Sequence, residues 1–185
     1  MGLNCGIVGL ANSGKTTIFN CMSSTKAQIT NFAFSSNKSN IAIVNVPDER
    51  LYVLEKLVKA AKVVHATVEI VDIPGLTKGS SKGEGMGNSF LADIRQTDAI
   101  IHVIRCFDDE NLPHIEGSVN AVRDKEIIDL ELQINDLEQV ERKMQRTEKA
   151  AKTGDKEAKH LLEVLTKYKN HLESFQSART LDIAD

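Results

Sequence analysis

The chemistry of this chain is first indicated by a glycine-rich loop, Gly9 to Thr16, which reads GLANSGKT and follows the apolar residues 3–8. A strand that ends in this pattern and reopens as a helix aims backbone N–H groups and a helix N-terminus at one point, which suits a triphosphate. Lys15 is expected to bridge the β- and γ-phosphates, and the Thr16 hydroxyl to ligate Mg²⁺. The predicted nucleotide contacts of this loop are Asn12, Ser13, Gly14, Lys15, Thr16 and Thr17.

A second polar element, Asp72 to Gly75, completes the predicted site. The run from Thr67 to Asp72 is typical of a buried strand, and it ends in Asp-Ile-Pro-Gly. In P-loop nucleotidases the acid at such a strand tip meets the water shell of Mg²⁺, and the glycine three residues later offers its N–H to the γ-phosphate. We therefore predict that Asp72 joins Thr16 at the metal and that Gly75 contacts the nucleotide.

The composition excludes several other classes of protein. The 185 residues are 41% hydrophobic and carry a net charge of -3, so the overall charge does not favour DNA or a membrane as partner. No basic segment precedes a hydrophobic run and no apolar stretch reaches membrane length, which predicts a cytoplasmic protein. Cys5, Cys21 and Cys106 lie in apolar segments and are expected to be small buried thiols in a reducing compartment.

Strand and helix patterns alternate through residues 1–123. Strands are expected at residues 3–8, 40–46, 67–73 and 99–105, and helices at 15–23, 48–61 and 88–96. This alternation predicts the α/β fold of a P-loop NTPase, with a parallel-rich sheet covered on both faces. The second helix has an apolar face that is expected to pack into the core, formed by Leu51, Leu54, Leu57 and Val58.

The pattern changes at about residue 124. Apolar residues at near-heptad spacing predict an antiparallel helical hairpin over residues 124–179, and residues 180–185 are expected to begin a return to the first domain. Gly154 is expected to take a left-handed C-cap and Asp155 to cap the second helix. The predicted apolar seam contains Ile127, Leu130, Ile134, Leu137 and Met144, then Ala158, Leu161, Leu165, Tyr168, Leu172 and Phe175.

The charges of the hairpin are graded along its length. Acidic residues lie towards its root, whereas the tip is basic. Such a tip suits contact with RNA phosphates, and it suits a solvated coiled-coil face equally well. The basic residues are Arg142, Lys143, Arg146, Lys149, Lys152, Lys156 and Lys159.

Two further features concern nucleotide switching and base recognition. Residues 78–88 are glycine-rich and follow Asp-Ile-Pro-Gly, where nucleotide switches have a segment that the γ-phosphate orders. No Asn-Lys-x-Asp motif, which reads guanine, follows residue 105. The chain is therefore expected to stop inside its nucleotide domain, with an incomplete sheet. Either it is a fragment of a longer protein or the missing strands come from elsewhere, because the strand at 99–105 would otherwise be an open edge.

Several segments together resemble the Obg-like ATPase (YchF) family of P-loop GTPases, and the likeness covers nearly the whole chain. The resemblance implies a Ras-like G domain with a coiled-coil hairpin inserted in it, followed by a TGS domain. It also implies a preference for ATP over GTP and an association with the ribosome or its RNA. The segments are Met1–Leu10, Val46–Leu51, Lys82–Asn88, Asp98–Val103, Arg105–Phe107 and His114–Val119.

The resemblance also implies roles for single residues. Leu76 takes the place of the glutamine that orients water in Ras-like enzymes, which predicts slow hydrolysis. His114 lies where the family has a histidine suspected of assisting catalysis, although a lone histidine in a loop is often a bystander. Asn12 resembles the asparagine that ligates K⁺ in cation-activated relatives, or it is a turn residue. Ser36 matches the threonine that senses Mg²⁺, in a segment that lacks the prolines of the family.

Two functions remain open at this point. The first is a Mg²⁺-dependent ATPase or GTPase of low intrinsic activity, with Lys15 and His114 as its catalytic residues and the ribosome as its partner. The second is a module that holds nucleotide without turnover and docks on the ribosome or RNA through its basic tip. Phosphate release by the full-length protein distinguishes the two.

Overall fold

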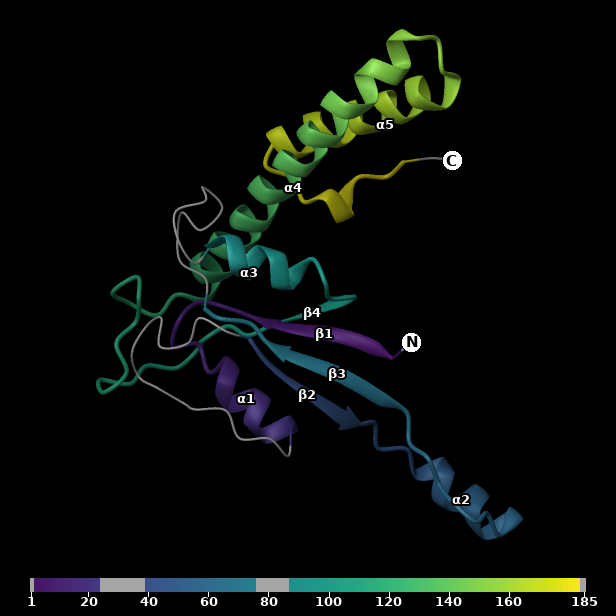
Figure 1. Ribbon diagram of the computed structural model, residues 1–185. Coiled ribbons are helices and arrows are strands. Elements are labelled where there is room, and N and C mark those ends of the chain that lie inside the picture. The colour runs from purple at the N-terminus through teal and green to yellow at the C-terminus, as the bar shows by residue number, and fades with distance from the viewer. Residues whose placement is uncertain (1, 24–38, 76–86, 184–185) are drawn as a thin grey trace. The chain divides into compact units, whose positions relative to one another are not determined.

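The computed structural model describes residues 2–23, 39–75 and 87–183, and the chain divides into two compact units. The first unit contains a four-stranded sheet in the order β2-β3-β1-β4 (Figure 1). β1 lies parallel to β3 and to β4, whereas β2 runs antiparallel to β3. The predicted parallel-rich α/β sheet is confirmed, with an antiparallel strand at one edge. The strands are β1 (Leu3–Val8), β2 (Asn40–Asn45), β3 (Thr67–Asp72) and β4 (Ala99–His102).

Helices lie on both faces of this sheet. α1 (Lys15–Met22) packs on one face, and α3 (Gly87–Ile94) lies over the other (Figure 1). Side chains of a strand alternate between the two faces, so Cys5 of β1 and its partner Ile70 of β3 point into the same layer. This apolar layer fixes the direction of β1 and therefore of the loop that follows it. Its buried members are Cys5, Ile7, Phe19, Ala42, Ile70 and Val103.

The helix α2 (Glu49–Val58) does not pack as the sequence predicts. Its first turn forms as expected, because the Asp48 carboxylate accepts a hydrogen bond from the backbone N–H of Arg50 at 3.0 Å. Its apolar side chains are exposed instead of buried, with Leu57 at 74% and Val58 at 70%. α2 lies beyond the ends of β2 and β3, away from the body of the sheet (Figure 1). The prediction was wrong because an amphipathic pattern shows which residues share a face and not what covers that face.

Two other predictions need correction. The fourth strand ends at His102 and not at residue 105, because the chain turns where the Arg105 side chain folds into the loop that follows. Of the three cysteines only Cys5 is buried, whereas Cys21 and Cys106 are exposed. The apolar residues next to Cys21 and Cys106 in the sequence therefore did not indicate burial of these two thiols.

The second unit, as far as it is described, is a pair of helices within residues 122–183. α4 (Ala121–Lys152) and α5 (Lys156–Glu173) run side by side (Figure 1), and a 3-10 helix follows at Ala178–Thr180. The ammonium of Lys169 on α5 lies 3.0 Å from the Glu141 carboxylate on α4, as an antiparallel pair requires. The division of the chain into residues 1–123, 124–179 and 180–185 stays a prediction.

The turn between the two helices follows the sequence signals. Gly154 has a φ of 95°, which is the left-handed conformation that favours glycine. Asp155 accepts the N–H groups of Glu157 and Ala158 on Oδ1, at 2.9 and 3.2 Å. Both predicted caps are confirmed. None of the helices in residues 2–23, 39–75 and 87–183 is long and apolar enough to cross a membrane.

The buried positions of the hairpin differ in part from the predicted seam. On α4 the apolar residue with 0% exposure is Ile128, whereas the predicted Leu130 is 38% exposed. Phe175, just past α5, is 74% exposed. Steps of three and four residues fit more than one helix face, so the spacing alone did not fix the register. The predicted residues that are buried are Ala158, Leu165 and Leu172.

Two isoleucines of the sheet provide a test of the core. Ile7 is 0% exposed and Ile43 is 70% exposed. Ile7→Ala is expected to lower the free energy of unfolding by about 2–5 kcal/mol because it leaves a cavity in a packed layer. Ile43→Ala removes the same atoms from an exposed position and should cost about 0.5 kcal/mol or less. Denaturant unfolding of the first unit measures both, and equal losses would contradict this core.

Candidate nucleotide-phosphate and metal site

The phosphate loop is shaped by the strand before it and the helix after it. β1 ends at Val8 and α1 begins at Lys15, with Gly14 as N-cap at φ 97°. That left-handed conformation favours glycine, which has no Cβ. Gly9 is required for a different reason, since a Cβ there would lie 2.4 Å from the Val103 carbonyl oxygen. The loop therefore lies tightly against the chain that leaves β4.

Lys15 is a buried ammonium group at the start of α1. The residue is 7% exposed, and its Nζ donates a hydrogen bond to the carbonyl oxygen of Leu10 at 2.7 Å. Burial lowers the pKa of Lys15 from 10.5 to about 8, although the negative charge of Asp72 opposes the shift. The protein thus holds a poorly solvated positive charge at the place where phosphates are expected.

Asp72 and Thr16 meet where β3 ends and α1 begins. The Thr16 hydroxyl donates to Asp72 Oδ2 at 2.8 Å, and Asn40 Nδ2 lies 3.4 Å from the same oxygen. The other carboxylate oxygen, Oδ1, is buried and has no hydrogen-bond partner among the described residues. Such an oxygen is costly to bury, and a hard cation satisfies it. Because Mg²⁺ prefers oxygen ligands, this hydroxyl and carboxylate fit the metal that the sequence predicts.

Gly75 brings the segment after β3 against the phosphate loop. A Cβ on this residue would lie 2.9 Å from the Cα of Ala11 and 3.1 Å from Lys15 Nζ. Any side chain at this position would therefore displace the loop or its ammonium. The backbone at Gly75 is close enough to Lys15 for both to contact one phosphate, which supports the predicted contact.

The loop between β4 and α4 brings His114 near the phosphate loop. Asn12, which has a φ of 61°, donates its Nδ2–H to the Pro113 carbonyl oxygen at 3.0 Å. The next residue, His114, accepts the N–H of Glu116 on its Nδ1 at 3.1 Å. A nitrogen that accepts a hydrogen bond carries no proton, so the neutral ring holds its proton on Nε2. In this tautomer His114 is a hydrogen-bond donor at Nε2.

Most of the predicted residues come together in this site, and a few do not. Thr17 is exposed on the first turn of α1, and Ser36 and Leu76 lie outside the described residues. Sequence reasoning missed Asn40, which becomes a neighbour of Asp72 only through the pairing of β2 with β3. It also missed Pro113, which contributes a backbone carbonyl oxygen. Every residue has this group, so the residue type does not indicate the contact. The residues brought together are Asn12, Ser13, Gly14, Lys15, Thr16, Asp72 and Gly75.

Comparisons with known proteins identify the family of this chain. Residues 4–178 match the family model of the 50S ribosome-binding GTPases. The chain belongs to this family. The ribosome-binding ATPase YchF of Escherichia coli O157:H7 is 47% identical to it over 184 residues, which cover 100% of this chain and 51% of the relative. The protein of the same name from Bacillus subtilis (strain 168) is 45% identical over 185 residues, which cover 100% and 50%.

A solved structure also resembles this chain. The YchF GTPase of Schizosaccharomyces pombe has a TM-score of 0.75 and 37% identity, over 99% of this chain and 50% of that chain. The resemblance to the Obg-like ATPase (YchF) family and the P-loop GTPase fold are confirmed. The chain spans about half the length of the curated relatives it matches.

Lys15 is expected to make nucleotide binding by this family member depend on pH. A bound triphosphate favours the charged ammonium, so binding raises the pKa of Lys15. At any pH at which the free protein has a neutral Lys15, binding is therefore accompanied by uptake of a proton. The affinity is therefore full below pH 8 and falls as the pH rises through 8 towards 10.5. We expect a loss of about 20-fold in ATP affinity between pH 7.5 and 9.5, measured by isothermal titration with Mg²⁺ present.

Lys15→Arg is the matched control, because a guanidinium keeps its charge over this pH range. Its affinity for ATP, whatever the absolute value, should change by less than about threefold over the same interval. An equally steep dependence in both proteins would show that another group is responsible.

Proposed function

We propose that the protein binds and slowly hydrolyses ATP or GTP with Mg²⁺ and acts as a ribosome-associated regulatory NTPase in the cytoplasm. The observation that carries the proposal is the Thr16 to Asp72 hydrogen bond beside the buried ammonium of Lys15. These groups are two Mg²⁺-type ligands and one phosphate-binding cation, all at the carboxyl ends of parallel strands. The matched relatives carry the name ribosome-binding ATPase YchF, which supports the same function.

Nucleotide binding would give partners to buried polar and charged groups that are incompletely hydrogen-bonded or poorly solvated in the protein alone. Lys15 would exchange its bond to the Leu10 carbonyl oxygen for charge-assisted bonds to phosphate oxygens, which are stronger. Thr16 and Asp72 would hold Mg²⁺, which when bound neutralises charge on the β- and γ-phosphates. The Ser13 hydroxyl, buried and without a partner among the described residues, would donate to a phosphate oxygen.

Hydrolysis would be slow and would depend on the loop after β4. Leu76 offers no polar group to orient water, so another group must do so. His114 would donate from Nε2 to a phosphate oxygen or to the attacking water, and in this tautomer it would not take the proton of that water. Asn12 also carries an amide oxygen, and oxygen ligands of this kind suit K⁺, which we propose as an activator held near this residue.

Asp72→Asn tests the proposal because it removes the charge at the metal site and keeps the shape of the side chain. We expect the Mg²⁺-dependent gain in ATP affinity to fall by about 10- to 100-fold, together with the rate of phosphate release. Glu69→Gln is the control on the same strand, since Glu69 bonds to Asn4 at 2.9 Å and lies outside the site. It should leave both measurements unchanged. An unchanged Mg²⁺ dependence in Asp72→Asn would contradict the metal assignment.

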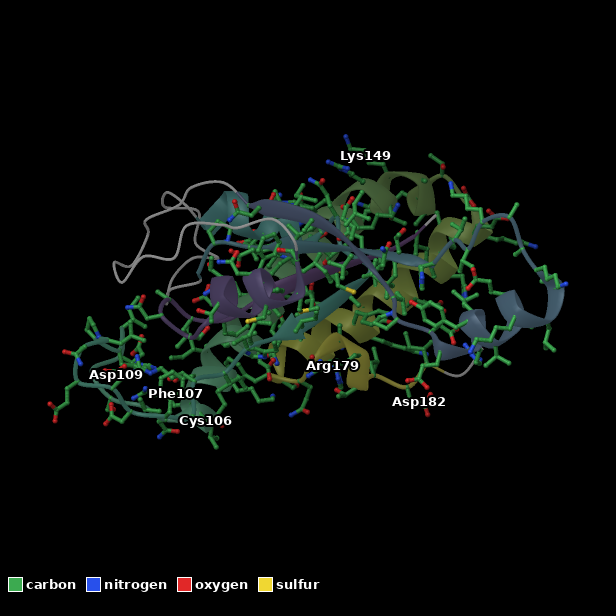
Figure 2. All side chains as sticks on the ribbon, turned by 90° about the horizontal axis from the view of Figure 1, so that it is seen from below. Cys106, Phe107, Asp109, Lys149, Arg179 and Asp182 are labelled. Carbon is green, nitrogen blue, oxygen red and sulfur yellow. The ribbon has the colours of Figure 1, made fainter. Side chains whose placement is uncertain are left out.

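A second candidate function is a binding module that holds nucleotide without turnover and docks on ribosomal RNA through the hairpin tip. It is favoured by the exposure of the tip residues, among which Lys149 stands on the last turns of α4 (Figure 2). Binding of ATP by the wild-type protein without phosphate release would select this function. The exposed basic residues are Arg142, Lys143, Arg146, Lys149, Lys152, Lys156 and Lys159.

Reversal of charge at the tip tests the partner that both functions share. Arg146→Glu with Lys149→Glu should weaken co-sedimentation with ribosomes and lower the salt dependence by about one unit of slope for each lost phosphate contact. Lys56→Glu with Lys62→Glu changes the net charge equally on an exposed part of the first unit and is the control. Equal losses for the two double variants would show a response to overall charge and would contradict a docking role for the tip.

A further inference from the structure

A buried arginine in the loop that follows β4 has no part in the phosphate site described above. Arg105 is 2% exposed and is among the largest fully buried side chains in the described residues. A buried guanidinium is costly unless its donors are satisfied. Its described hydrogen-bond partners are backbone carbonyl groups, and all of them belong to the loop between β4 and α4.

These contacts tie the beginning of the loop to its middle. Arg105 Nε donates to the Phe107 carbonyl oxygen at 3.0 Å, and Nη1 donates to that of Leu112 at 2.9 Å. Nη2 lies 3.5 Å from the carbonyl oxygen of Asp109. The Phe107 ring lies over the guanidinium, with 5.1 Å between Cζ and the ring centroid. Figure 2 shows Phe107 and Asp109 on this loop.

From Leu112 the restraint continues to the phosphate loop. The next residue is Pro113, whose ring fixes φ and leaves ψ as the one free rotation before its own carbonyl group, so the position set at Leu112 restricts where the Pro113 carbonyl group can lie. That carbonyl oxygen accepts the hydrogen bond from Asn12 at 3.0 Å. His114 follows directly, with its ring held by the Glu116 N–H. The position of His114 beside the phosphate loop therefore depends on a chain of contacts that begins at Arg105.

We propose that Arg105 is a positioning residue for nucleotide hydrolysis. Its guanidinium holds Leu112 so that Pro113 meets Asn12 and His114 is kept beside the phosphate loop. This inference rests on the proposed function, in which His114 assists turnover. The planar fork of an arginine can reach three carbonyl groups at fixed angles, whereas the ammonium of a lysine is a point charge on a flexible stem. Arg105→Lys therefore keeps the positive charge and removes the fixed arrangement of hydrogen-bond donors.

The first test separates turnover from binding in the full-length protein. Arg105→Lys should lower single-turnover phosphate release by about 10- to 100-fold, while the Kd for Mg²⁺-ATP stays within about twofold. In a His114→Ala background the same substitution should cause no further loss of phosphate release, because both changes remove the same contribution, that of His114. Arg50→Lys is the control, since Arg50 is an exposed partner of Asp48 outside the site. An equal loss in the presence and absence of His114, or a parallel loss of ATP affinity, overturns the proposal.

The second test does not need turnover. In Arg105→Lys the backbone amides of residues 107–117 and 10–13 should exchange hydrogen about tenfold faster or more, and those of α2 should not change. Unchanged exchange in these loops overturns the proposal even if the protein proves to be a non-hydrolysing module. If Arg105→Lys folds poorly, Phe107→Ala removes only the ring over the guanidinium and should give the same pattern in weaker form. No change in Phe107→Ala would then count against the proposal.

Discussion

The hydrogen bond from Thr16 to Asp72, beside the buried ammonium of Lys15, is the constraint on which the first unit depends. A lysine and an aspartate are seldom buried unless they are paired or bind a ligand. They lie together because β1 and β3 are parallel, which brings the loop after β1 and the acid at the end of β3 to one edge of the sheet. The apolar layer around Ile7 and Phe19 is the rigid base that holds them there.

The same cluster explains why a ligand belongs at this edge. Each buried polar atom without a partner costs about 1–3 kcal/mol, and two such atoms among the described residues are Asp72 Oδ1 and the Ser13 hydroxyl oxygen. The lowered pKa of Lys15 records a similar cost for its charge. In the proposed function, a metal-bound triphosphate would remove all three penalties at once. In that function, part of the favourable free energy of binding would thus come from giving these buried polar groups the partners that they lack in the free protein.

The sequence predicted the features that depend on local backbone geometry. The phosphate loop, the left-handed turn at Gly154 and the cap at Asp155 are requirements of a few neighbouring residues, and all three were correctly predicted. Burial was predicted less well, because it depends on what distant segments supply. The exposed face of α2 and the exposed thiol of Cys106 show this limit. Within the site, Asn40 and Pro113 were missed because one is placed by strand pairing and the other contributes only its backbone.

In the proposed function, binding and turnover rest on different parts of the fold, and this separation has a physical cause. Lys15, Thr16 and Asp72 stand on or beside paired strands and a helix, so many hydrogen bonds fix them together. Asn12 bonds to Pro113, the residue before His114, in a loop without regular structure whose carbonyl groups bond to one buried guanidinium. In that function, a site built in this way would hold nucleotide firmly, while its rate of hydrolysis would depend on the order of a single loop. In the proposed function, any partner that tightens or loosens the loop after β4 would therefore change turnover more than affinity.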